Sequence, residues 1–175
     1  MHKRIIICGG NGSGKSTLGY ALSQRTGMPF FDIEDYYFPD KTKEYIYDVG
    51  RSREQVKKLL YHDIRKCDSF ILAAVKPDFD EKVNSFYTSA IYINVPKPIR
   101  MKRVRNRSYQ KYGDKILPGG ELHEKEESFF RMVQERSNII IEKWLDTLHI
   151  PVIEIDGTKP IGESVEILVK QLNII

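Results

Sequence analysis

Several residue types are scarce in this 175-residue sequence, and each scarcity excludes a class of protein. Its two cysteines, Cys8 and Cys67, lie too far apart for a close-spaced metal motif and indicate reduced, buried thiols. No apolar run approaches the roughly 18 residues that cross a membrane. The run after the basic start MHKR is too short for a secretory signal peptide. We therefore expect a cytoplasmic protein with no membrane partner.

The remaining composition is that of an ordinary globular domain. Hydrophobic residues make up 41% and charged residues 30% of the chain. A chain of this length is most simply one domain, 1–175, that buries roughly two thirds of its unfolded surface. The net charge of +4 is modest, so nucleic acid is not expected as a partner. The sequence does not indicate an oligomeric state.

Apolar runs alternate with helical patterns along the chain. The runs predict five buried strands, at 5–8, 30–33, 70–75, 90–95 and 152–155. Helical spacing predicts helices over 16–26, 80–87 and 124–148, one capped by Ser52, one that starts near Pro98, and one at the carboxyl end. Strands joined by helical crossovers indicate a doubly wound parallel sheet, in which ligands bind at the carboxyl ends of the strands.

The turn after the first strand carries the strongest functional signal. Residues 9–17 read GGNGSGKST and match G-x-x-x-x-G-K-[ST], between an apolar strand and a helix. Glycines permit positive φ and close approach of the backbone, whose amides bind anions with the helix N-terminus. Lys15 directs charge at β- and γ-phosphates, and the Ser16 hydroxyl suits Mg²⁺. The motif predicts that ATP and Mg²⁺ bind at Gly10, Asn11, Gly12, Ser13, Gly14, Lys15, Ser16 and Thr17.

With this motif and this element order, the chain resembles the adenylate kinase, shikimate kinase and gluconate kinase group of small P-loop kinases. The resemblance spans the chain in element order, while motifs other than the P-loop match only locally. It implies an α/β, three-layer P-loop NTPase fold with a five-stranded parallel sheet, helices on both faces and a lid. It also implies transfer of the γ-phosphate of ATP to a small-molecule acceptor such as a nucleoside, a nucleotide or a metabolite. Within the single domain, it implies an acceptor region at 34–66 and a lid at 108–123.

An acidic run follows the second predicted strand. Shikimate kinase-like proteins carry Asp-x-Asp here, which implies that Asp32 lies near the metal and Glu34 faces the acceptor. The run from Glu34 to Tyr37 also resembles a uridine kinase segment, which implies that Asp35 is the base. A strand continuing through Ile33 would put Asp32 and Glu34 on one side of it. A phosphotransferase needs a carboxylate to accept or align the acceptor proton, and the sequence leaves the choice among the three open.

The third predicted strand departs from the pattern of many P-loop proteins. It reads FILAAVK and ends without a Walker B aspartate, which leaves Asp32 as the metal-side candidate. Nucleoside monophosphate kinases carry Asp-Gly-x-Pro-Arg here, so the segment 74–78 weakens that assignment. Lys76 could replace the arginine as a contact to a substrate anion. The acceptor is further expected to contact Tyr37, Arg53 and, from a later helix, Arg131, which together with Arg136 could also return to the phosphates.

Arginines and a turn predict the rest of the nucleotide site. In the adenylate kinase group, the helix that follows the fourth strand ends in an arginine that packs on the adenine and reaches the phosphates. The resemblance implies this role for Arg107, with Arg103 beside it. The Gly- and Pro-containing segment 108–123 resembles the lid that follows. The loop DGTKP resembles the segment that lies against the adenine, which implies contacts from Thr158, Lys159 and Pro160. An exposed basic helix and an ordinary turn would also explain these residues.

Two other functions stay open at this point. One is an ATP-binding switch or ATPase without a small acceptor, and the other is a kinase acting on a nucleic-acid end. The missing Walker B aspartate argues against a strong hydrolase. The acidic runs at 32–35 and 124–127 reduce the positive charge of the surface, which argues against binding to nucleic acid. The sequence therefore predicts an ATP- and Mg²⁺-dependent kinase with an unidentified acceptor. The catalytic candidates are Lys15, Asp32, Asp35 and Arg107.

Overall fold

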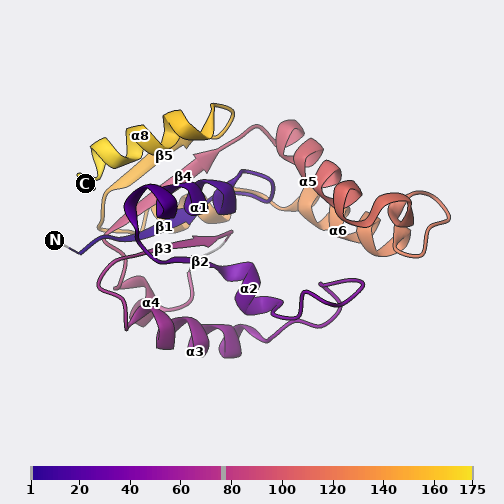
Figure 1. Ribbon diagram of the computed structural model, residues 1–175, viewed down its shortest axis with the longest axis horizontal. Coiled ribbons are helices and arrows are strands. Elements are labelled where there is room, and N and C mark those ends of the chain that lie inside the picture. Colours follow the sequence, from indigo (N-terminus) through magenta and orange to yellow (C-terminus); the bar gives the residue numbers. More distant parts are fainter. Residues whose placement is uncertain (1, 76–77, 175) are drawn as a thin grey trace.

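Figure 1 shows a computed structural model of the protein, which describes residues 2–75 and 78–174. Within these residues, five parallel strands form one sheet in the order β2-β3-β1-β4-β5. The strands are β1 (Arg4–Cys8), β2 (Phe30–Asp32), β3 (Phe70–Ala74), β4 (Ser89–Asn94) and β5 (Val152–Asp156). The helices are α1 (Lys15–Thr26), α2 (Ile33–Tyr37), α3 (Arg53–Ile64), α4 (Glu81–Asn84), α5 (Lys97–Tyr112), η1 (Gly113–Ile116), α6 (His123–Glu135), α7 (Ile139–Leu145) and α8 (Ile161–Gln171). None of these described helices combines the length and apolar character needed to cross a membrane.

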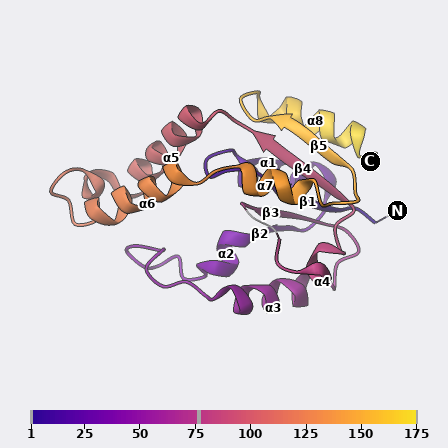
Figure 2. The ribbon, with the colours of Figure 1, turned by 180° about the vertical axis from the view of Figure 1, so that it is seen from behind.

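The sheet is covered on both faces, as predicted. Side chains of a strand alternate between faces, so Ile5 and Ile7 of β1 pack in one cluster with residues of α1 and α8. Ile6 and Cys8 point the other way, into a cluster with residues of α3 and α7. Figure 1 shows α1 in front of the sheet, and Figure 2, seen from behind, shows α7 in front. The resulting three-layer α/β arrangement brings the carboxyl ends of all five strands to one edge.

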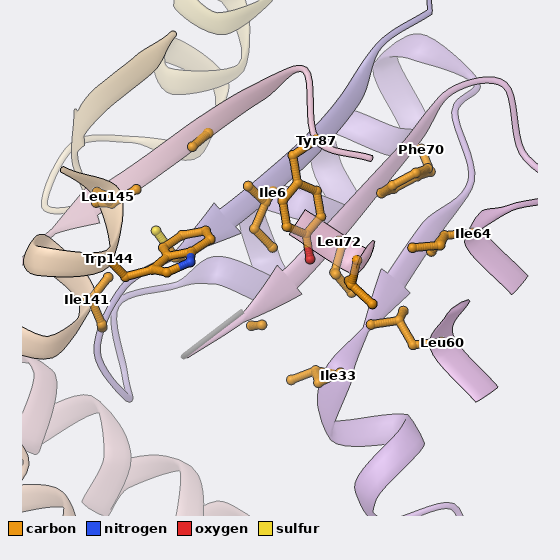
Figure 3. Close-up of a cluster of buried hydrophobic side chains, with 14 of the residues drawn as sticks. Ile6, Ile33, Leu60, Ile64, Phe70, Leu72, Tyr87, Ile141, Trp144 and Leu145 are labelled. Carbon is orange, nitrogen blue, oxygen red and sulfur yellow. The ribbon is translucent and has the colours of Figure 1, made fainter. Parts of the chain in front are cut away.

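The second of these clusters contains the single tryptophan. Figure 3 shows Trp144 and Tyr87 beside Ile6 and Leu72. The Trp144 ring meets the Tyr87 ring edge-on, with centroids 6.5 Å apart. Burial raises the pKa of the Cys8 thiol to about 12, so this side chain remains a protonated, packed thiol. These residues form the core beneath the functional edge.

Helix α3 begins where its capping signal predicts. The Ser52 hydroxyl accepts a hydrogen bond from the Gln55 amide at 3.3 Å, and the Gln55 side chain accepts one from the Ser52 amide at 2.9 Å. This reciprocal pair satisfies two amides that would otherwise lack helical partners. The helix then buries Val56, Leu60 and Ile64 against the sheet.

Replacing Ser52 with alanine is expected to lower the free energy of unfolding by about 1 kcal/mol, because the Gln55 amide loses its acceptor. Urea denaturation followed by circular dichroism measures this loss. Ser128, an exposed serine within α6, is the matched control, since alanine is the better helix former there. Equal stability of the two variants would contradict the capping role.

The structure corrects the prediction for the end of the second strand. Strand β2 ends at Asp32, and α2 begins at Ile33 instead of the strand continuing through it. The cause is the Asp32 carboxylate, which accepts a hydrogen bond from the Glu34 amide at 3.0 Å and so caps the helix. The prediction that strand alternation puts Asp32 and Glu34 on one side is therefore wrong. Ile33 still packs in the core.

The predicted long helix over 124–148 is also wrong, because it is two helices. Backbone dihedrals turn extended at Arg136, and α7 begins only at Ile139. Ser137 accepts a hydrogen bond from the Ile139 amide at 3.2 Å, which favours the break. Asn138 donates to the Tyr92 hydroxyl of β4 at 3.3 Å. The helical periodicity continues across the break, so the pattern alone does not reveal it.

Helices α5 and α6 project beyond the carboxyl edge of the sheet, away from both termini (Figure 1). The predicted lid segment therefore consists of the last turn of α5, η1, a turn and the start of α6. Its aromatic and aliphatic side chains form a third cluster with Tyr45 of the loop after α2. Glu126 is fully buried at this place, and burial followed by the Glu126 carboxylate raises the pKa of Tyr45 above its ordinary range.

Candidate active site

The glycine-rich loop lies between β1 and α1, and it opens on a small pocket. Gly12 has φ +77°, and a Cβ there would lie 2.5 Å from the Arg100 carbonyl oxygen, so only glycine fits. Gly14, at φ +98°, precedes the first turn of α1, whose amides point out of the helix. This pocket, called the loop pocket below, measures about 170 Å³ and is lined by Asn11, Gly12, Gly14, Lys15, Ser16, Thr17, Glu34, Arg103, Val104 and Arg107.

Two residues of the motif support the loop from beneath. Gly10 provides its carbonyl oxygen to the Ser13 amide at 3.1 Å and to Lys15 Nζ at 3.1 Å. Ser13 is buried, and its carbonyl oxygen lies against the Gly157 position. These contacts hold the loop closed on itself and against the turn that contains Gly157.

Lys15 is one of three cations that line the loop pocket, with Arg103 and Arg107. Burial lowers its pKa to about 8, while the charges of Glu34 and then Asp32 oppose this fall and that of Arg107 adds to it. An ammonium group that has lost part of its hydration through burial is stabilised by an anionic partner. Since helix N-termini and loop amides favour the same charge, the pocket has the chemistry of a phosphate site.

The three carboxylates of the acidic run lie in different places. Glu34 lines the loop pocket and, with Asn11, also lines a second and larger pocket beside it. Asp32 caps α2 and influences Lys15 by its charge. Asp35 is exposed, pairs with Lys41 at 2.9 Å, and lines a shallow cavity that does not include the P-loop residues. Glu34 is thus the carboxylate that faces both pockets.

The second pocket, called the aromatic pocket below, measures about 470 Å³. Its walls come from the P-loop, α2 and the loop after it, α3, and the break between α6 and α7. The predicted acceptor residues Tyr37 and Arg53 line it, whereas Lys76 lies outside the described residues. The complete lining is Asn11, Ile33, Glu34, Tyr37, Phe38, Tyr47, Arg53, Val75, Phe129, Met132, Arg136, Ser137, Ile140 and Ile141.

The arginines of α5 have separate tasks. Arg100 is buried, and its guanidinium donates to the carbonyl oxygens of Val95 at 3.1 Å and Asn11 at 3.3 Å, which fastens the loop to α5. Arg103 donates to the Gly157 carbonyl at 2.9 Å and lines the loop pocket. Arg107 lines the same pocket one turn further along. Arg103 and Arg107 therefore both line the loop pocket, and their contact with a nucleotide stays a prediction.

Of the two arginines expected from the helix after the lid, Arg136 lines the aromatic pocket and Arg131 does not. Arg131 is exposed on α6 and is not among the residues that line the two pockets. Arg136, at the end of this helix, lines the aromatic pocket and donates to the Asn11 side chain at 3.0 Å. The helix break orients Arg136 toward the P-loop, and the sequence pattern did not contain that break.

The loop after β5 lies against the P-loop. A Cβ at Gly157 would lie 2.4 Å from Ile93 and 3.0 Å from the Ser13 carbonyl oxygen, which demonstrates close packing. Thr158 donates to the Asp156 carboxylate from its amide at 2.9 Å and from its hydroxyl at 2.6 Å. Thr158, Lys159 and Pro160 are exposed next to the point that Arg103 contacts. Their contact with a nucleotide base stays a prediction.

Sequence reasoning missed two aromatic residues that join α6 to the acceptor side. Tyr47 stacks on Phe129 of α6, with centroids 5.6 Å apart and an interplanar angle of 16°. Lys115 pairs with Glu44, and Lys125 pairs with Asp48 at 2.7 Å across the same gap. Tyr47 lies in an irregular tract with no periodicity, so only its aromatic character could have indicated a role.

The donor groups suit both ATP and Mg²⁺. Phosphates would meet the amides that begin α1, Lys15, Arg103 and Arg107. Mg²⁺ prefers oxygen ligands, and the exposed Ser16 hydroxyl with a carboxylate nearby provides them. Within the described residues no cluster of three or more His, Cys, Asp or Glu side chains forms a metal site on its own.

No protein-family model matches the chain. Solved structures share its fold: the deoxyadenosine kinase of M. mycoides with bound dATP has a TM-score of 0.61 at 16% identity, covering 97% of this chain and 99% of that one. The shikimate kinase of Bacteroides thetaiotaomicron has a TM-score of 0.60 at 21% identity, covering 98% of both chains. The sequence of a shikimate kinase from this organism also aligns over 143 residues, 77% of this chain and 79% of that protein, at 21% identity. These likenesses confirm the predicted P-loop kinase fold.

A whole-length relative comes from Bacillus subtilis (strain 168), where it is described as "Uncharacterized protein YqaC". It is 30% identical over 174 residues, which covers 95% of each protein. With its P-loop kinase fold and this full-length match, the chain belongs to the same family as YqaC of Bacillus subtilis.

Proposed function

We propose that the protein is a P-loop phosphotransferase, which moves the γ-phosphate of ATP to a hydroxyl group of a small molecule in the presence of Mg²⁺. The observation that carries this proposal is the position of Glu34, which lines both pockets. An ATPase needs only the loop pocket and a water molecule. A second, larger pocket that shares a carboxylate with the first favours an acceptor other than water.

The proposed step uses the two pockets together. The acceptor lies in the aromatic pocket with its hydroxyl toward Glu34, which takes the hydroxyl proton as the oxygen attacks the γ-phosphorus. A bond forms between the acceptor oxygen and this phosphorus, the bond to the β–γ bridging oxygen breaks, and ADP is released. Lys15, Arg107 and Arg136 neutralise the negative charge of the transferring group. Mg²⁺, held by Ser16 with Asp32 nearby, would supply charge neutralisation on the phosphate oxygens.

The proposal also assigns a role to the acceptor region and to the lid segment. Residues 34–66 form the acceptor side, and residues 108–123 form a lid that excludes water. Thr158, Lys159 and Pro160 provide the surface beside the nucleotide base. This assignment makes Glu34 the base in place of Asp35, because Asp35 pairs with Lys41 outside both pockets.

The test is ADP release from ATP and Mg²⁺, measured with and without pools of hydroxylated metabolites. We expect a slow basal rate that at least one pool raises about tenfold or more, since water would be a poor substitute for a bound acceptor. Mass spectrometry of the stimulating pool should show one phosphorylated product. A basal rate that no pool raises would instead support an ATPase or an ATP-dependent switch.

A further inference from the structure

The aromatic pocket has a composition that selects among acceptors. We infer that the acceptor is a nucleoside, an inference that rests on the proposed function. Its flat base packs against the rings of Tyr47 and Phe129, while a hydroxyl group of its sugar contacts Glu34. Four of the lining side chains are aromatic, and a further five are aliphatic or methionine. The aromatic members are Tyr37, Phe38, Tyr47 and Phe129.

The aromatic wall and the carboxylate belong to one continuous space. Tyr47 stacks on Phe129 and meets the edge of Phe38, with centroids 5.0 Å apart at an angle of 90°. Burial, and after it the charge of Glu34, raises the pKa of Tyr47 to about 12. Tyr47 is therefore within electrostatic reach of Glu34. A base on this wall would leave its sugar near the junction of the two pockets, where a hydroxyl is needed.

A polyol acid fits this pocket poorly. Each hydroxyl of such a molecule loses its water contacts on binding and needs a partner in the protein. The charged lining groups other than Glu34 are Arg53 and Arg136, and each makes one hydrogen bond within the protein, so two side chains would have to serve the carboxylate and several hydroxyls of such a molecule. Arg136 donates to Asn11, while Arg53 donates to the Asp78 carbonyl and lies over the Phe79 ring at 5.4 Å. Aromatic faces, by contrast, suit any heterocyclic base.

The junction also distinguishes a nucleoside from a nucleoside monophosphate. A phosphate acceptor carries its own negative charge and requires no base to remove a proton. The Glu34 carboxylate at the junction would repel it, whereas a hydroxyl gains an acceptor for its proton. The combination of an aromatic wall with a carboxylate at its inner end therefore favours the uncharged nucleoside.

The experiment compares acceptors on the wild-type chain with ATP and Mg²⁺. The panel contains ribo- and deoxyribonucleosides of each base, the corresponding monophosphates, gluconate and shikimate. We expect one or more nucleosides to show kcat/KM at least about tenfold above gluconate and shikimate, the factor that one stacked base commonly contributes. Faster turnover of a polyol acid or of a monophosphate than of every nucleoside would overturn the inference.

A variant pair tests the aromatic wall itself. Tyr47→Leu should raise KM for the preferred nucleoside about tenfold with little change in KM for ATP, while Tyr47→Phe should retain the wild-type value because the ring remains. Tyr20→Leu removes a tyrosine that is 61% exposed on α1 and is the matched control. Thermal melting confirms that all three variants fold. Equal KM values for Tyr47→Leu and Tyr20→Leu would contradict a base on this wall.

Binding separates this inference from the proposed function. Nucleoside binding is measured by calorimetry in the presence of a non-hydrolysable ATP analogue, so that no transfer is required. A nucleoside that binds without stimulating ADP release would support the pocket assignment and oppose the phosphotransferase. Stimulation by shikimate or gluconate without nucleoside binding would support the phosphotransferase and overturn the nucleoside.

Discussion

Replacing Glu34 with glutamine is expected to lower acceptor-dependent turnover by about 100- to 10,000-fold, the range that general-base catalysis contributes. The amide keeps the size of the side chain and its place in both pockets, but it cannot take the proton of the acceptor hydroxyl. ATP should still bind with little loss, because Lys15, the loop amides and the arginines remain. Coupled measurement of ADP, with titration calorimetry for ATP, separates the two effects.

Asp35→Asn is the matched control for this change. It removes a carboxylate next to Glu34 in sequence, yet Asp35 pairs with Lys41 at the surface and lines neither the loop pocket nor the aromatic pocket. We expect near wild-type turnover from this variant. Severe loss in Asp35→Asn together with an active Glu34→Gln would exchange the two roles and return the base to Asp35.

Replacing Lys15 with alanine is expected to weaken ATP binding roughly 10- to 100-fold, the effect of losing a charge-assisted hydrogen bond. The expected loss depends on pH. In the free protein Lys15 has a pKa of about 8, and phosphates beside it would raise this pKa in the complex. The contribution of Lys15 to the free energy of ATP binding is therefore complete below about pH 8. It is lost as the pH rises through the higher pKa that Lys15 has in the complex.

The measurement is ATP affinity by calorimetry from pH 7 to pH 10, in buffers of different ionisation enthalpy. Wild-type binding should take up a proton above about pH 8, and Lys15→Ala should lack this uptake. Lys170→Ala, at an exposed position on α8, serves as the matched control and should behave as wild type. Unchanged ATP affinity in Lys15→Ala would refute the phosphate role of the loop pocket.

The sequence was informative wherever a local pattern matched a local structure. The P-loop motif, the apolar strands and the capping pair of Ser52 and Gln55 each depend on near neighbours, and the fold confirmed the parallel sheet. The sequence pattern was misleading at Ile33 and at Ser137, where one hydrogen bond from a backbone amide to a side chain outweighs strand alternation or helical periodicity. Tyr47, Phe129 and Arg136 come together only through tertiary packing, so no spacing along the chain could reveal the aromatic pocket.

The contacts between the lid and the acceptor side have a thermodynamic consequence. Tyr47 stacks on Phe129, Lys115 pairs with Glu44, and Lys125 pairs with Asp48, so the loop after α2 is fastened to η1 and α6 around the aromatic pocket. That pocket shares Asn11 and Glu34 with the loop pocket. A ligand that orders one wall also orders part of the other. Under the proposed function the two substrates are then coupled, and reciprocity requires that the acceptor increases ATP affinity by the same factor as ATP increases acceptor affinity. We therefore expect positive cooperativity between the substrates, carried by the residues Asn11 and Glu34 that line both pockets.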